Sequence, residues 1–293
     1  SSVGRAKLRT TSSLSGNRVC SIASKWPNRF IRSAVELPIS AIRSPGRNSS
    51  GNLLGGLRQG STEAGRKVDV SASEVVLEES AQALRTGDLI LAPKDRVEVR
   101  GGAKASSNAS TAADTLVFEG DGALLRLSHD ANATTVRTGV QRVAGELSIG
   151  SGVQLQGGAL TAEATARTHI PSDASFDTRS TTLGAARIAV GDVSQDVAGE
   201  DTLVISPQLA QALGRAESTT LRSYDSIDFH GQASLGSAQQ KALTLDAGTL
   251  RIASEGGSAQ VSAGSLTLTN TSGAPAADQG GNGSQTLQAT RQP

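Results

Sequence analysis

The strongest constraint on the fold is a recurrence of apolar residues every 22 to 23 positions. Leu221, Leu243 and Leu266 lie 22 and 23 residues apart, and Ile227 and Leu250 lie 23 residues apart. Around these positions large apolar residues alternate with polar ones, which is the period-two pattern of short strands with one buried face. The recurrence and the alternation together predict a solenoid.

Each unit of about 22 residues is expected to form one coil of a parallel β-helix, with corners of Gly, Ser, Asp and Asn. A single coil cannot bury its inward residues, so stability comes from stacking on neighbouring coils. An antiparallel sandwich or barrel is the alternative, because it also contains many short strands with turn signals at regular spacing. The in-register recurrence favours the solenoid.

The same spacing appears earlier in the chain. Pairs at offsets of 21 to 22 residues are Val68 with Leu89, Val75 with Val97, Leu125 with Leu147, and Leu127 with Ile149. These matches predict that the members of each pair stack in adjacent coils. The solenoid is therefore expected to begin near residue 61 and to continue to about residue 275.

Three segments interrupt the strand pattern. Residues 101–114 are rich in Ser, Ala and Asn and predict a loop that leaves the stack. Residues 165–182 are polar and contain a proline, so we expect a second excursion, where a solenoid would place binding residues. Residues 207–216 predict one short helix, with Ser206 as its cap and Pro207 in its first turn.

Composition disfavours compact enzymes and carbohydrate-binding modules. Only 2% of the residues are aromatic and there is no Met, whereas such proteins usually use aromatic side chains for core volume and ligand stacking. A narrow solenoid core of Leu, Ile, Val and Ala fits this composition better. The single Cys20 excludes an intramolecular disulfide, and no run of 18 apolar residues predicts a membrane-spanning helix.

Charge divides the chain into two parts. Residues 1–60 carry ten Lys and Arg residues against the single acid Glu36, a net charge of +9, while the remainder carries 18 basic and 26 acidic groups, a net charge of −8. The basic segment is interpreted as flexible and solvated, although a basic arm for anionic partners is the alternative. We expect no nucleic-acid partner. Residues 276–293, which include a Gly-Gly-Asn-Gly stretch, are interpreted as a flexible tail.

The best local cluster of chemical groups is Asp225, Asp228 and His230. If Ile227 and Phe229 point inward, strand alternation places Asp228 and His230 together on the outer face. Any outward-facing strand would produce this spacing, so we interpret them as solvated residues on the outside of a coil.

Other candidate chemistry has weaker support in the sequence. Asp173 and Asp177 fall in the expected excursion, and the remaining histidines, His129 and His169, are far apart with no cysteine near them. Nucleophile-elbow, phosphate-loop and His-Glu-x-x-His motifs are missing. We therefore expect no catalytic residues, no cofactor and no metal site, and hence a protein that is not an enzyme.

Several segments resemble one known family. They read DGALLRLS, GELSIGSGVQLQGGALTAEAT, ISPQLAQALG, LRSYDSIDF and LTLDAGTL. Residues 65–270 resemble the C-terminal region of filamentous haemagglutinin-like exoproteins, most strongly from residue 201 onward. The N-terminal secretion domain of that family has no counterpart in this sequence, and residues 1–60 match no part of the family.

The resemblance implies a right-handed parallel β-helix in a secreted or outer-membrane-associated surface protein of a Gram-negative bacterium. It implies export by two-partner secretion through an outer-membrane pore partner. It also implies attachment to a host-cell or bacterial surface receptor or glycan.

Three functions are thus open at the level of the sequence. The first is a structural and adhesive segment of a surface-exposed exoprotein. The second is a β-helical hydrolase or lyase acting on polysaccharides, since clustered carboxylates on such a scaffold can cleave glycans. The third is a truncated remnant without function.

Overall fold

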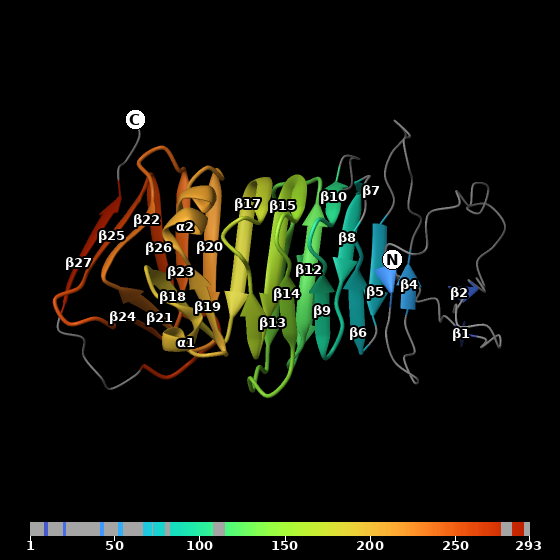
Figure 1. Ribbon diagram of the computed structural model, residues 1–293, viewed down its shortest axis with the longest axis horizontal. Helices are drawn as coiled ribbons and strands as arrows, with labels where there is room; N and C mark the ends of the chain where they lie inside the picture. Colours follow the sequence, from blue (N-terminus) through green and yellow to red (C-terminus); the bar gives the residue numbers. More distant parts are fainter. Residues whose placement is uncertain are drawn as a thin grey trace.

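The computed structural model describes residues 9–10, 20–21, 42–43, 52–54, 67–71, 73–79, 83–107, 115–276 and 283–289. These residues form a parallel β-solenoid of about nine turns with a spacing of about 23 residues, so the predicted all-β solenoid is confirmed. The coils follow one another along the long axis from β5 to β27 (Figure 1). No helix among the described residues has the length and apolarity needed to cross a membrane.

The first face of the solenoid is one long sheet that follows most of the stack. In spatial order its strands are β26 (Ser265–Thr269), β23 (Ala242–Asp246), β20 (Ser218–Ser223), β17 (Ser175–Ala185), β15 (Gln154–Ala164), β12 (Ala123–Ser128), β8 (Asp88–Leu91), β5 (Lys67–Ser71) and β4 (Asn52–Leu54).

The second face consists of two sheets. One contains β16 (Arg167–His169), β14 (Glu146–Ile149), β9 (Arg96–Val99), β6 (Glu74–Leu77) and β3 (Ile42–Arg43), and the other contains β19 (Thr202–Ile205), β18 (Arg187–Gly191), β21 (Ser226–His230) and β24 (Thr249–Ile252).

The third face contains β7 (Leu84–Thr86) and β10 (Lys104–Ser107), the first part of β15, and then β22 (Gln232–Gly236), β25 (Ser258–Ala263) and β27 (Ser284–Ala289). Two further two-stranded sheets are β1 (Arg9–Thr10) with β2 (Cys20–Ser21), and β11 (Thr115–Glu119) with β13 (Thr134–Thr138).

The core consists of inward side chains that stack from coil to coil. Val75 stacks on Val97, and both are fully buried. Val190, Phe229 and Ile252 likewise occupy matching positions on successive second-face strands. These apolar ladders confirm the predicted stacking of inward residues, because each row is covered by the same row of the next coil.

The repeat offsets read from the sequence are confirmed in part. The pairs Val68 with Leu89, Val75 with Val97, Ile227 with Leu250, and Leu243 with Leu266 are register partners. Leu221, however, pairs with Leu245 and not with Leu243. The offset of 22 was wrong at that step by one side-chain period, because two leucines of β23 both point inward and either could complete the pattern.

The predicted match of Leu125 and Leu127 with Leu147 and Ile149 is wrong. Strand β12 lies antiparallel to both of its neighbours on the first face, β8 and β15. Strand β14 lies on the second face, beside β9 and β16. The chain thus reverses direction once inside the stack, which an alternating pattern cannot reveal because it is the same in both directions.

Two expected loops are also corrected. Residues 165–182 contain β16 and most of β17, so they belong to the stack and do not form an excursion. Within residues 101–114, Lys104–Ser107 forms strand β10, while residues 108–114 lie outside the described residues. Polar outward-facing side chains had given both segments the composition of loops.

The predicted helix is confirmed as α2 (Pro207–Leu213), where the Ser206 hydroxyl accepts a hydrogen bond from the Leu209 amide at 3.2 Å. Buried Leu209 and Leu213 join the core, so α2 takes the third-face position of its coil (Figure 1). A second short helix, α1 (Gln195–Ala198), was not predicted.

Both ends of the solenoid differ from the predicted boundaries. In the basic segment, β3 and β4 pair antiparallel with β6 and β5. In the expected tail, β27 pairs with β25 over residues 284–289, so this part is not a flexible linker. The remainder of residues 1–60, and residues 277–282 and 290–293, lie outside the described residues.

Candidate functional site

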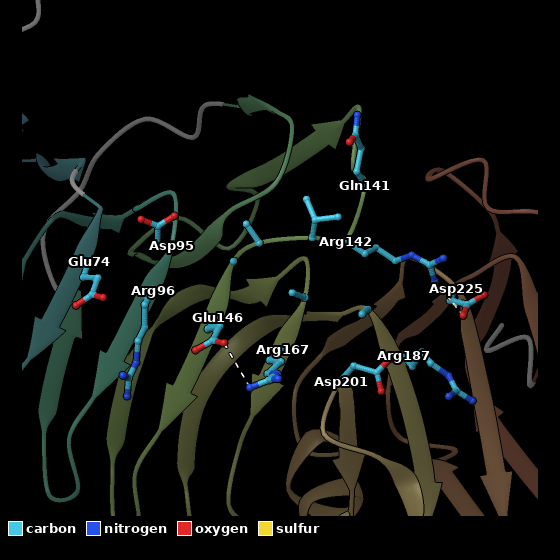
Figure 2. Close-up of a pocket in the computed structure, with 15 residues that line it drawn as sticks. Glu74, Asp95, Arg96, Gln141, Arg142, Glu146, Arg167, Arg187, Asp201 and Asp225 are labelled. Atoms are coloured by element: carbon cyan, nitrogen blue, oxygen red, sulfur yellow. Dashed lines mark ion pairs between the residues drawn. The ribbon is translucent and has the colours of Figure 1, made fainter.

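A polar groove runs across the starts of the second-face strands and is the best candidate site (Figure 2). It is open and shallow, with a volume of about 830 Å³. Its charged lining residues are Glu74, Asp95, Arg96, Arg142, Glu146, Arg167, Arg187, Asp201 and Asp225. A groove lined in this way is suited to polar or charged ligands and not to apolar ones.

The floor of the groove is a row of alternating charges. Glu74, Arg96, Glu146 and Arg167 are the first residues of successive second-face strands and are register partners. Arg167 lies 3.6 Å from Glu146 and 3.2 Å from Glu200, and its side chain is 55% exposed. Since adjacent strands lie about 4.8 Å apart, the row offers charges of alternating sign along the solenoid axis.

An arched loop, residues 139–145, covers one side of the groove. The Asp121 carboxylate holds this arch by accepting backbone hydrogen bonds from Gln141, Arg142 and Val143 at 2.9 to 3.0 Å. Burial raises the pKa of Asp121, but these amide hydrogen bonds outweigh it and the pKa lies below its ordinary value.

Arg142 carries the arch to the far end of the groove. Its backbone has a φ of 66°, a left-handed conformation that costs energy for a residue with a Cβ. Its guanidinium lies 2.9 Å from the Asp225 carboxylate, which belongs to a turn far along the chain (Figure 2). The Arg142–Asp225 ion pair therefore joins the arch to a distant coil.

The Asp225, Asp228 and His230 cluster is not a set of solvated side chains. Asp228 does point outward between Ile227 and Phe229, but its side chain is only 5% exposed because Arg187 and Arg251 cover it. The guanidinium of Arg251 makes two hydrogen bonds to Asp228, at 2.6 and 2.7 Å, and Arg187 adds one at 2.9 Å.

These partners determine the protonation state of Asp228. Burial raises the pKa of Asp228, but hydrogen bonds from Arg251 and Ser226, with the charges of Arg251 and Arg187, lower it below its ordinary value. Burial also lowers the pKa of His230. An ionised Asp228 held by two arginines has no proton to donate, so it is poorly suited to general acid catalysis.

The other residues considered from the sequence are scattered. Asp173 accepts hydrogen bonds from the Ser151 hydroxyl and the Gly152 amide, and Asp177 accepts one from Gln156 at 3.0 Å. The His129 ring lies 3.4 Å from the Ser107 carbonyl. Within the part of the chain that the structure describes, no group of His, Cys, Asp and Glu side chains is arranged to hold a metal ion.

A buried ion cluster, which the sequence did not indicate, lies on the outer side of the first face. Its centre is Glu163, which is fully buried and lies 2.8 Å from Arg137 and 3.4 Å from Arg222. Arg222 also lies 3.1 Å from Asp246. Nearby, Arg126 makes the same kind of buried contact with Asp88 at 3.0 Å.

The β11–β13 sheet covers this cluster and is called the flap below. Arg126 donates a hydrogen bond to the Thr134 carbonyl at 2.8 Å, and Arg222 donates one to the Thr135 carbonyl at 3.3 Å. Arg137, from β13, reaches down to Glu163 and lies 5.1 Å from the centre of the Phe118 ring. The ion cluster therefore fastens the flap to the outside of the stack.

Gly184 makes room for the cluster. It is the register partner of both Glu163 and Arg222 and lies on the strand between them. A Cβ atom at this position would lie 2.6 Å from the Cβ of Glu163, which is closer than such atoms can approach. The missing side chain lets Arg222 extend across β17 to Glu163.

Replacing Gly184 with alanine is therefore expected to lower stability by about 1–3 kcal/mol, the typical cost of overpacking. Urea denaturation of the purified protein would measure this loss. Gly231→Ala is a less suitable comparison because of its positive φ, whereas Thr182→Ala changes an outward residue of the same strand. Equal stability of the Gly184→Ala and Thr182→Ala proteins would contradict the proposed role of the glycine.

No family model, curated protein or solved structure matches this sequence. The site must therefore be interpreted from its own geometry.

Proposed function

We propose that this chain is a structural and adhesive segment of a secreted or surface-exposed exoprotein that attaches to cells or surfaces. The observation that carries the proposal is the charged groove along the second face, formed by residues that repeat from coil to coil. A stack of coils repeats its surface side chains along one axis, and such extended surfaces suit attachment to large partners. The resemblance to filamentous haemagglutinin-like exoproteins supports the same function.

Within this proposal, the contact surface is the groove and not residues 165–182 as such. Arg167 is the exposed arginine at the middle of its floor, beside Glu146. The partner is a host-cell or bacterial surface receptor or glycan with charged groups. For the full-length protein, the same proposal includes export through an outer-membrane pore partner.

Binding of the purified chain to epithelial cells and to bacterial cells, measured by flow cytometry with labelled protein, tests the proposal. Arg167→Glu is expected to weaken binding on the order of tenfold, because one charge-assisted hydrogen bond contributes about 1.5–3 kcal/mol. Arg179→Glu is the matched control, since Arg179 is also an exposed arginine paired with a glutamate but lies outside the groove.

Two results would contradict this function. If the unaltered chain binds neither kind of cell, the adhesive role is wrong, and if Arg167→Glu and Arg179→Glu bind equally, the groove is not the contact surface. Asp228→Asn separates the adhesive from the enzymatic hypothesis, because it should leave binding intact. A glycan-cleaving activity that Asp228→Asn abolishes would support the enzyme instead.

A further inference from the structure

Strand β26 ends the long first-face sheet with an open edge. It pairs in parallel with β23 along its whole length, from Ser265 to Thr269. Within the described ranges, no strand pairs with its other edge. The outward-directed amide and carbonyl groups of such an edge are a template for another strand.

The inward side chains at this edge continue the core rows but lack a covering coil. Leu268 is the register partner of Leu245, yet Leu245 is 1% exposed and Leu268 is 50% exposed. On the third face, Leu287 is 43% exposed while its partner Val261 is fully buried. These leucines lie at core positions, so a matching apolar row laid over them would bury them.

The sequence of β26, Ser-Leu-Thr-Leu-Thr, is almost symmetric about Thr267. A two-fold axis at Thr267 would place Leu266 of one copy opposite Leu268 of the second copy in an antiparallel pair. Both leucines would remain on the inward side, where cross-strand apolar pairs stabilise sheets. The strand contains no charge and no proline, the residues that usually prevent edge pairing.

The opposite end of the stack differs. There the sheets finish in the short antiparallel strands β3 and β4, of two and three residues. Very short edge strands are themselves a device against association. The cross-section that fits the β26 end is therefore the β26 end of another copy, in an isologous contact.

We propose that two copies of this chain associate end to end by antiparallel pairing of β26 about a two-fold axis at Thr267. Sedimentation of the 293-residue chain, at concentrations on the order of 10 to 100 μM where weak interfaces associate, should show a species of twice the chain mass. Leu268→Lys should convert it to a monomer, because the new charge would be buried without a partner in the dimer.

Disulfide trapping tests the two-fold position itself. In a Cys20→Ser background, Thr267→Cys should form a covalent dimer on mild oxidation, since residues opposite each other in an antiparallel pair bring their Cβ atoms to about 4.5–5.5 Å. Thr244→Cys is the matched control: Thr244 is the register partner of Thr267 on the neighbouring internal strand and should stay reduced.

The proposal would be overturned by a chain that sediments as a monomer throughout this concentration range. It would also be overturned by a dimer that survives Leu268→Lys, or by a Thr267→Cys protein that is trapped no more than Thr244→Cys. Circular dichroism of each variant verifies that it is folded, which is expected because Leu268 is half exposed.

Discussion

Replacing Glu163 with alanine is expected to destabilise the protein by about 3–5 kcal/mol, the cost of removing one partner from a buried ion pair. The change would leave Arg137, whose side chain is 3% exposed, without its carboxylate. Arg222 would lose one of its two acidic partners and keep Asp246. Urea denaturation at neutral pH, followed by far-ultraviolet circular dichroism, measures the loss.

The matched control for this prediction is Glu217→Ala. Glu217 also contacts two cations, Arg179 and Lys241, but these pairs are on the surface. Hydrogen bonds from Arg179 and Lys241 lower the pKa of Glu217 to about 2, yet exposed ion pairs contribute little to stability. Glu163→Ala and Glu217→Ala proteins of equal stability would show that burial of the ion cluster does not matter.

A double substitution separates the loss of a contact from the cost of an isolated charge. Glu163→Leu combined with Arg137→Leu removes both members of the shortest ion pair in the cluster. Because the two residues are in contact, the combined loss should be smaller than the sum of the single losses. Additive losses would mean that Glu163 and Arg137 stabilise the flap independently.

The second large effect is expected for Phe229→Ala, at about 3–5 kcal/mol. Phe229 is 1% exposed and is covered in register by Val190 and Ile252 on the neighbouring second-face strands. Truncation to alanine leaves a cavity that two flanking strands, held by backbone hydrogen bonds, cannot readily close. The shift of the thermal unfolding midpoint, together with urea denaturation, measures the effect.

Two comparisons make this prediction specific to packing. Phe229→Leu should recover most of the loss, because leucine keeps apolar volume at the same inward position. Val197→Ala removes apolar atoms from a side chain that is 73% exposed and should have little effect. If Phe229→Ala costs no more than Val197→Ala, the aromatic side chain does not support the stack.

The regular coils were predictable from the sequence because their signal is doubly periodic. Val75 and Val97, or Ile227 and Leu250, combine the alternation within one strand with the repeat between strands. Each inward row is covered only by the next coil, so the spacing of residues in the sequence equals the coil length. Ser206 and Pro207 added local helix-start chemistry, which made α2 predictable to within a few residues.

Strand direction and strand cover were not predictable in the same way. The alternation in β12 is the same whether the strand runs with or against its neighbours, so its reversal left no trace in the pattern. Outward polar residues in β16 and β17 gave those strands the composition of a loop. An outward charge such as Glu163 appears solvated until the flap is known to cover it.

The candidate site shows the same limit. Sequence alternation correctly placed Asp228 on the outer side of β21, but the arginines that bury it come from β18 and β24, far away in the sequence. The charge row from Glu74 to Arg167 was equally invisible, because its members begin strands that only the coil register brings together.

The reversed strand β12 has a consequence for how the chain acquires its structure. On the second face β9 lies directly beside β14, while on the first face β12 separates β8 from β15. Ordered growth that adds one coil at a time cannot pass this point until the chain has doubled back and closed a long loop, which is slow. Folding is therefore expected to begin separately in the coils before and after β12, which join when β12 is inserted.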